Sequence, residues 1–126
     1  MSQKRYSRDH EWVELNGDTA TIGISTYAVS ELGDIIFVEL PEVGTELGAG
    51  DKLAVVESVK AASDVYAPIA GVVAEVNDAL ADESAMLNED PEGGAWIARL
   101  TVNDASDFDA LMSKIEYEAY LKEAGH

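Results

Sequence analysis

The sequence predicts a mainly β fold, either a sandwich or a partly open barrel, that ends in a C-terminal helical segment. Its apolar residues fall in short runs with a period of two, and glycine, proline and asparagine turns separate these runs. Asn16-Gly17 is a strong hairpin signal between two of them. After Asp104 the spacing changes to about 3.6 residues, which is typical of an amphipathic helix. No repeat divides the 126 residues, so we expect a single domain over 1–126.

Each predicted element follows from the local pattern of residues. A short helix over 27–32 can be capped by Ser25 or Thr26 and ended by Gly33. The stretch 79–94 is polar and irregular, with at most one helical turn near 85–87. Strands are expected at 6–15, 19–24, 35–40, 53–56, 72–76 and 96–102, which gives a core over about 6–102.

The C-terminal part is expected to form helices over about 106–123. The apolar residues Phe108, Leu111, Met112 and Ile115 have helical spacing, and the spacing repeats beyond them. Ser106 and Ser113 each stand three residues before an acidic residue, the pattern of a capping box, so a break is expected near Ser113. We expect this segment to cover a sheet edge or an open face.

Composition and charge exclude several classes of protein. No apolar run approaches the roughly 20 residues that span a bilayer, and the N-terminus resembles neither a secretory signal nor a transit peptide. A cytoplasmic location is therefore expected. The net charge of −17 repels nucleic acid and anionic membranes, so neither is expected as a partner. The acidic surface serves solubility, and it would also favour encounters with more basic proteins.

Residues suited to catalysis are scarce in this chain. Cysteine is absent, and His10 and His126 are the only histidines. No nucleophile–base set can be assembled from them, and no carboxylate spacing indicates a metal site. Any redox chemistry would therefore have to come from an attached group.

Lys60 lies near the middle of a predicted hairpin, between the apolar runs 53–56 and 72–76. Its neighbours Ala61 and Ala62 are small, and Glu57 stands three residues before it. A lysine on a turn is usually only a solvated charge. An exposed amine among small neighbours is also accessible to an enzyme that attaches a cofactor through an amide bond. Such a tethered group would reach partner active sites at high local concentration.

The segment around Lys60 resembles the lipoylation signature of the glycine cleavage system H protein family. Biotinyl domains fit less well because methionines usually flank their lysine, and lipoyl domains of 2-oxoacid dehydrogenases typically have aspartate before it. The signature comprises Glu57-Ser58-Val59-Lys60-Ala61, Ser63-Asp64-Val65-Tyr66-Ala67-Pro68 and Gly71.

The resemblance extends over about 6–121, with the matching segments in the family's order. They are His10-Glu11-Trp12, Ile22-Gly23-Ile24, Leu32-Gly33-Asp34-Ile35, Phe37-Val38-Glu39-Leu40-Pro41 and Gly94-Ala95-Trp96-Ile97. Four positions depart from the family's common residues: Tyr27 from histidine, Ser84 from proline, Glu92 from tyrosine and Arg99 from lysine.

The resemblance implies a lipoyl-type barrel-sandwich hybrid that carries lipoate on Lys60, with Glu57 and Asp64 around the modification site. It implies a non-catalytic carrier that shuttles the aminomethyl group of glycine. The implied partners are the pyridoxal-phosphate enzyme glycine decarboxylase, an aminomethyltransferase, dihydrolipoamide dehydrogenase for reoxidation, and a lipoate-attaching enzyme. No metal is implied.

The loaded arm ends in a cationic amine that is prone to hydrolysis, so a carboxylate-lined cleft that excludes water would protect it. Similarity to the family gives Glu11 and Asp64 this role, with Asp9 at a further lining position. Without the family, Glu11 would be interpreted as a surface carboxylate on a strand and Asp64 as a turn residue.

Two alternatives remain open at this point. The same Lys60 would serve a lipoate donor or relay protein that supplies other lipoyl-dependent complexes. The chain could instead be an unmodified β domain that acts as a binding scaffold. We expect a monomer, since the exposed lysine gives no reason for self-association.

Overall fold

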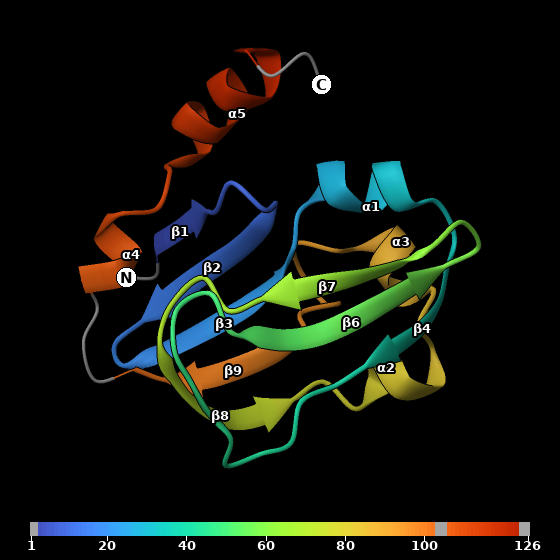
Figure 1. The fold of residues 1–126 in the computed structure, drawn as a ribbon, viewed down its shortest axis with the longest axis horizontal. Helices are drawn as coiled ribbons and strands as arrows, with labels where there is room; N and C mark the ends of the chain where they lie inside the picture. Colours follow the sequence, from blue (N-terminus) through green and yellow to red (C-terminus); the bar gives the residue numbers. More distant parts are fainter. Residues whose placement is uncertain (1–2, 103–105, 124–126) are drawn as a thin grey trace.

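The computed structural model describes residues 3–102 and 106–123, which form two antiparallel sheets and short helices (Figure 1). The large sheet has the order β1 (Gln3–Tyr6), β2 (Glu11–Asn16), β3 (Thr19–Ile24), β9 (Ala98–Thr101), β8 (Gly71–Val76), β5 (Glu46–Leu47). The small sheet has the order β4 (Ile35–Glu39), β6 (Lys52–Ser58), β7 (Ala62–Tyr66). The helices are α1 (Thr26–Leu32), α2 (Ala79–Asp82), α3 (Met86–Glu89), α4 (Ser106–Asp109) and α5 (Lys114–Glu123).

The main core lies where the two sheets face each other. Val13, Ile22 and Leu100 from the large sheet and Val56 from the small sheet are fully buried in it. Leu80 from α2, Leu87 from α3 and Phe108 from α4 join the same cluster. Burying such side chains stabilises the fold by about 1.5–3 kcal/mol each. The alternating pattern predicted the buried faces of β3 and β9, where Ala20, Ile22, Ala98 and Leu100 all lie in the core.

Two local predictions are confirmed by the structure. The Asn16-Gly17 hairpin joins β2 to β3, with Asn16 opposite Thr19 and Gly17 at a φ of 65°. Ser25 caps α1, because its hydroxyl accepts a hydrogen bond from the Ala28 N–H at 3.2 Å. Such local signals work because each depends on only a few neighbouring residues.

The predicted strand over 6–15 is wrong as a single element. A turn over residues 7–10 divides it into β1 and β2, which pair with each other so that Tyr6 lies opposite Trp12. His10 has a φ of 70°, in the left-handed region that non-glycine residues seldom adopt. A strand pattern cannot reveal this conformation, since it is held by contacts from distant parts of the chain.

The predicted return strand of the Lys60 hairpin is also wrong. The strand that returns from the Lys60 turn to pair with β6 is β7, in which Ala62 lies opposite Glu57. The run 72–76 is β8, which pairs with β5 and β9 in the other sheet. Only Val65 of β7 is buried, so this strand lacks the apolar alternation that would identify it from sequence.

The segment 79–94 is more ordered than predicted. It contains α2 as well as the helical turn expected near 85–87, which is α3. Asn88 of α3 links this segment to the chain before β4, because its side chain accepts a hydrogen bond from the Ile35 N–H at 2.9 Å and donates one to the Gly33 carbonyl at 2.8 Å.

We expect Asn88→Ala to lower the free energy of unfolding by about 1–2 kcal/mol, since both hydrogen bonds are lost together. Urea denaturation would measure the change. Glu89→Ala, on the same short helix and exposed, is the matched control and should change stability by less than about 0.5 kcal/mol. Equal effects of the two substitutions would show that the Asn88 contacts contribute little.

The C-terminal segment forms two helices that cover the edge strand β1, as predicted (Figure 1). The backbones of Tyr6 and Met112 exchange hydrogen bonds of 2.7 and 2.9 Å, which protects that edge. The capping box before α5 is confirmed: the Ser113 N–H donates to the Glu116 carboxylate at 2.8 Å, and the Glu116 N–H donates to the Ser113 hydroxyl at 3.2 Å.

Candidate functional site

Lys60 lies on the tight turn between β6 and β7, and Ser58 fixes that turn. The Ser58 hydroxyl accepts hydrogen bonds from the N–H groups of Lys60 and Ala61, both at 3.2 Å, and donates to the Ala61 carbonyl at 3.1 Å. The Val59 N–H donates to the Asp34 carbonyl at 3.0 Å. Ser58 is buried while Lys60 is exposed, so the turn presents an amine on a well-supported backbone.

The Lys60 side chain extends toward the C-terminal end of α1. Its ammonium donates to the Glu31 carbonyl at 3.5 Å, where the negative end of the helix dipole favours a cation. Gly33 follows with a φ of 80°, and a Cβ built there would lie 3.7 Å from Lys60 Cε. A contact at that distance is ordinary, so space alone would admit a larger residue. Glycine is favoured at this position because its φ is positive.

The structure places Glu57 and Asp64 on the strands that flank the Lys60 turn. Glu57 in β6 is half-buried between Phe37 of β4 and Ala62 of β7. Asp64 in β7 is exposed and lies opposite Val55. Both carboxylates therefore belong to the same three-stranded sheet as the lysine.

Glu11, at the start of β2, is buried, with 2% of its surface exposed. Its carboxylate accepts hydrogen bonds from the Ser7 hydroxyl at 2.6 Å and from the Tyr66 N–H at 3.2 Å. Burial raises the pKa of Glu11 from 4.5 to about 7; the bonds from Ser7 and Tyr66 oppose this rise, and the charge of Asp9 adds to it. Glu11 thus connects the large sheet to β7, the strand that carries Asp64.

The predicted site residues form two groups. Glu11 lies within the electrostatic reach of Asp9 and contacts β7 directly. Lys60 lies at the turn before β7, with its ammonium on the end of α1. The strand β7 joins the two groups, since it begins two residues after Lys60 and ends at Tyr66.

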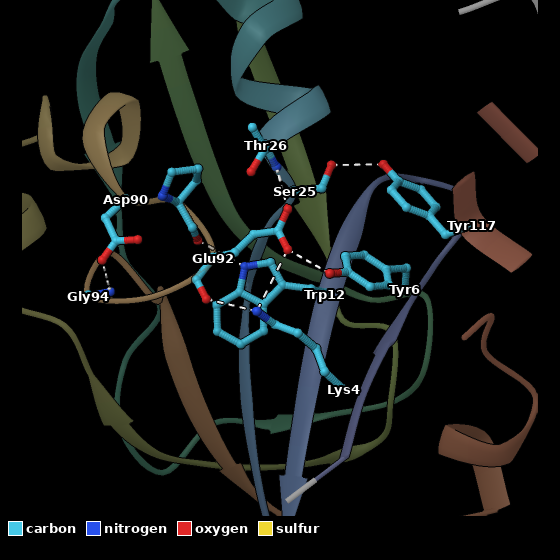
Figure 2. Close-up of polar contacts among 10 residues, drawn as sticks. Lys4, Tyr6, Trp12, Ser25, Thr26, Asp90, Glu92, Gly94 and Tyr117 are labelled. Atoms are coloured by element: carbon cyan, nitrogen blue, oxygen red, sulfur yellow. Dashed lines mark hydrogen bonds and ion pairs between the residues drawn. The ribbon is translucent and has the colours of Figure 1, made fainter. Parts of the chain in front are cut away.

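Glu92 is the centre of a polar cluster that sequence patterns do not reveal (Figure 2). Its carboxylate accepts hydrogen bonds from the Tyr6 hydroxyl at 2.6 Å and the Thr26 N–H at 2.8 Å, and it lies 3.6 Å from the Lys4 ammonium. Burial opposes ionisation of Glu92, but these hydrogen bonds and the Lys4 charge outweigh it and lower its pKa. Glu92, which stands where the family commonly has tyrosine, thus links β1 to the start of α1.

Trp12 packs beside this cluster and supports the strand that begins at Glu11. Its indole N–H donates to the Pro91 carbonyl at 2.9 Å (Figure 2). Gly23 on β3 allows the ring to lie flat against the sheet, because a Cβ there would come within 2.7 Å of the indole nitrogen. The matched pair of Trp12 and Gly23 therefore positions the chain next to Glu11.

A membrane-spanning helix and a metal-binding cluster are both absent from the described ranges 3–102 and 106–123. No helix in them is long and apolar enough to cross a membrane. They also contain no group of three or more histidine or acidic side chains placed to hold a metal ion.

The two packed antiparallel sheets, with Lys60 exposed on the turn between β6 and β7, have the lipoyl-type barrel-sandwich fold of carrier domains, as comparison with a solved structure shows. A solved structure of this class, a glycine cleavage system H protein from Mycobacterium marinum, superimposes with a TM-score of 0.81 and 34% sequence identity over 98% of each chain.

The sequence comparisons extend this result from class to family. The family described as "Glycine cleavage H-protein" matches residues 4–124. The glycine cleavage system H protein of Acidiphilium cryptum is 57% identical over 96% of this chain and 98% of its own. That of Phenylobacterium zucineum is 54% identical over 93% and 97%. The chain therefore belongs to the glycine cleavage H-protein family, the lipoyl carriers of the glycine cleavage system.

Proposed function

We propose that Lys60 is the residue on which this carrier bears its lipoyl group. The observation that carries the proposal is the exposed Lys60 amine on a turn whose backbone N–H groups are hydrogen-bonded to the buried Ser58 side chain. The residues fit the group: Lys60 is exposed, and its ammonium reaches the Glu31 carbonyl at the end of α1. Amide formation would remove one positive charge from a chain of net charge −17 and so end that attraction.

The chain acts as a carrier and contributes no catalytic group of its own in this proposal. When bound, lipoate supplies a dithiolane that can be reduced and can hold a one-carbon cargo. Glycine decarboxylase, the aminomethyltransferase and dihydrolipoamide dehydrogenase would act on the arm in turn, after a lipoate-attaching enzyme has placed it. The acidic surface supports rapid, reversible encounters with such partners where their docking surfaces are basic.

Glu11, Asp9 and Asp64 are proposed to hold the cationic amine of the aminomethyl cargo. The contact of Glu11 with β7 and its proximity to Asp9 support this role. A pKa of about 7 suits it, because a nearby cation favours the ionised carboxylate and would pull that pKa down. Burial of Glu11 limits access of water at the same place.

We expect Glu11→Gln to speed the hydrolytic decay of the loaded carrier about tenfold, while lipoylation proceeds normally. Hydrolysis breaks the carbon–sulfur and carbon–nitrogen bonds of the aminomethyl group and, with one water, gives the thiol, formaldehyde and ammonium. Formaldehyde release from purified loaded protein is therefore the measurement. Glutamine can still accept the Tyr66 N–H, so the fold should be retained.

Glu14→Gln, on the same strand β2, is the matched control and should leave the decay rate unchanged. Equal decay of the Glu11 variant and the wild type would exclude Glu11 from holding the cargo. The assignment of Lys60 would stand in that case, because lipoylation is measured separately.

A further inference from the structure

The turn over residues 7–10 is held closed by hydrogen bonds at both ends. The Ser7 N–H donates to the Glu11 carbonyl at 2.8 Å, and the His10 N–H donates to the Ser7 carbonyl at 3.2 Å. The Ser7 hydroxyl donates to the Glu11 carboxylate at 2.6 Å and accepts from the Glu11 N–H at 3.1 Å. The position of the Glu11 side chain therefore depends on the shape of this turn.

His10, immediately before Glu11, is the one non-glycine residue with a positive φ in the described ranges 3–102 and 106–123. A side chain in the left-handed region is strained and persists only where the surroundings fix it. Besides ring contacts with Tyr27 and Tyr120, two hydrogen-bonding contacts from distant parts of the chain hold His10. The Ser25 N–H donates to the His10 carbonyl at 2.8 Å, and the His10 Nδ1 lies 2.7 Å from the Tyr117 hydroxyl.

Tyr117 is the buried anchor of α5, with 4% of its surface exposed. Its ring stacks on Tyr6 with the ring centres 4.6 Å apart, and its hydroxyl lies 2.8 Å from the Ser25 hydroxyl (Figure 2). The same Ser25 hydroxyl caps α1. One phenol oxygen thus contacts both the His10 turn and the start of α1.

We propose that Tyr117 is a positioning residue for the cargo site, whose hydroxyl holds His10 in its left-handed conformation and thereby sets the placement of Glu11. This inference rests on the proposed role of Glu11. It gives the C-terminal helix a second role besides covering the edge of the large sheet. Tyr117 acts through His10 and does not itself contact the cargo.

The test compares Tyr117→Phe with Tyr6→Phe. Both variants lose one phenol hydroxyl and keep the stacked pair of rings, but the Tyr6 hydroxyl contacts Glu92 and not His10. We expect Tyr117→Phe to speed decay of the loaded carrier at least threefold, with lipoylation unchanged. The loaded Tyr6→Phe carrier should decay at the wild-type rate, even if this substitution lowers the thermal midpoint by as much as Tyr117→Phe does.

A second readout does not need the loaded arm. The chain has two histidines, so long-range proton–nitrogen NMR spectra can report the His10 imidazole directly. Loss of the Tyr117 hydroxyl should shift the His10 Nδ1 resonance, and loss of the Tyr6 hydroxyl should leave it in place. His10→Asn provides a further variant, because asparagine tolerates a positive φ without the contact to Tyr117. It should therefore keep the turn and decay more slowly than Tyr117→Phe.

The outcomes separate this inference from the proposed function. If Glu11→Gln accelerates decay while Tyr117→Phe does not, Tyr117 has only a structural role and the inference is wrong. Decay of His10→Asn as fast as that of Tyr117→Phe would also contradict it, because the φ of residue 10 would then not be what Tyr117 controls. Equal acceleration by Tyr6→Phe and Tyr117→Phe would also overturn it, because general loosening would then explain both. If Glu11→Gln has no effect, the cargo role of Glu11 fails, and the positioning role built on it fails as well.

Discussion

Lys60→Arg is expected to abolish the carrier function completely. A guanidinium group cannot accept the lipoyl acyl group as a stable amide under the conditions that acylate a lysine amine, so no arm is attached. The positive charge is retained, and arginine can still donate to the Glu31 carbonyl at the end of α1. Glycine cleavage reconstituted from purified components should therefore fall to background, while the free energy of unfolding changes by less than about 0.5 kcal/mol.

Lys52→Arg is the matched control for this experiment. Lys52 is exposed at the opposite end of β6, and its replacement should leave both lipoylation and carrier activity at wild-type levels. Residual glycine cleavage with the Lys60 variant, above that of a reaction without any carrier, would show that another residue bears the arm.

The second large effect is a pH dependence of stability that originates at Glu11. Its pKa rises from 4.5 to about 7 on folding because of burial. Between those values the folded state binds a proton that the unfolded state has lost. The stability that Glu11 gains from binding this proton in the folded state is therefore fully present below pH 4.5. It is lost as the pH rises through 7. A shift of this size corresponds to about 3 kcal/mol, as an upper bound.

Glu11→Gln removes this titration, and all other ionisable groups remain. Its free energy of unfolding relative to the wild type should rise by up to about 3 kcal/mol between pH 4 and pH 8. Urea denaturation at several pH values measures that difference, and Glu14→Gln provides the reference for removing an ordinary carboxylate from β2. A difference between Glu11→Gln and wild type that is independent of pH would show that Glu11 titrates as in the unfolded chain.

Much of the fold was predictable because its signals are local. The Asn16-Gly17 turn, the Ser25 cap and the Ser113–Glu116 capping box each involve residues that are close in sequence. The alternation of apolar residues likewise identified β3, and the continuous apolar run 53–56 identified β6.

The elements that were missed depend on distant contacts. The 7–10 turn needs Ser25 and Tyr117 to hold His10 at a positive φ. The strand β7 is defined by backbone pairing with β6, and its small exposed residues resemble a loop. Neither kind of information is present in a window of neighbouring residues.

The site was predictable in part. Lys60 and the carboxylates of Glu11 and Asp64 could be named from the resemblance to the family. The residues that support them could not: Ser58 has the sequence appearance of an ordinary turn residue, and Glu92 stands where the family commonly has tyrosine. Their hydrogen bonds appear only once the chain is folded.

The central claim is that Lys60 bears a single lipoyl group, and the intact mass of the protein purified from its native host tests it most directly. The mass should exceed that of the bare chain by one lipoyl group, with the modification located by peptide fragmentation at Lys60 and absent in Lys60→Arg. A native pool that has the mass of the unmodified chain, or a lipoyl group on another residue, would contradict this account.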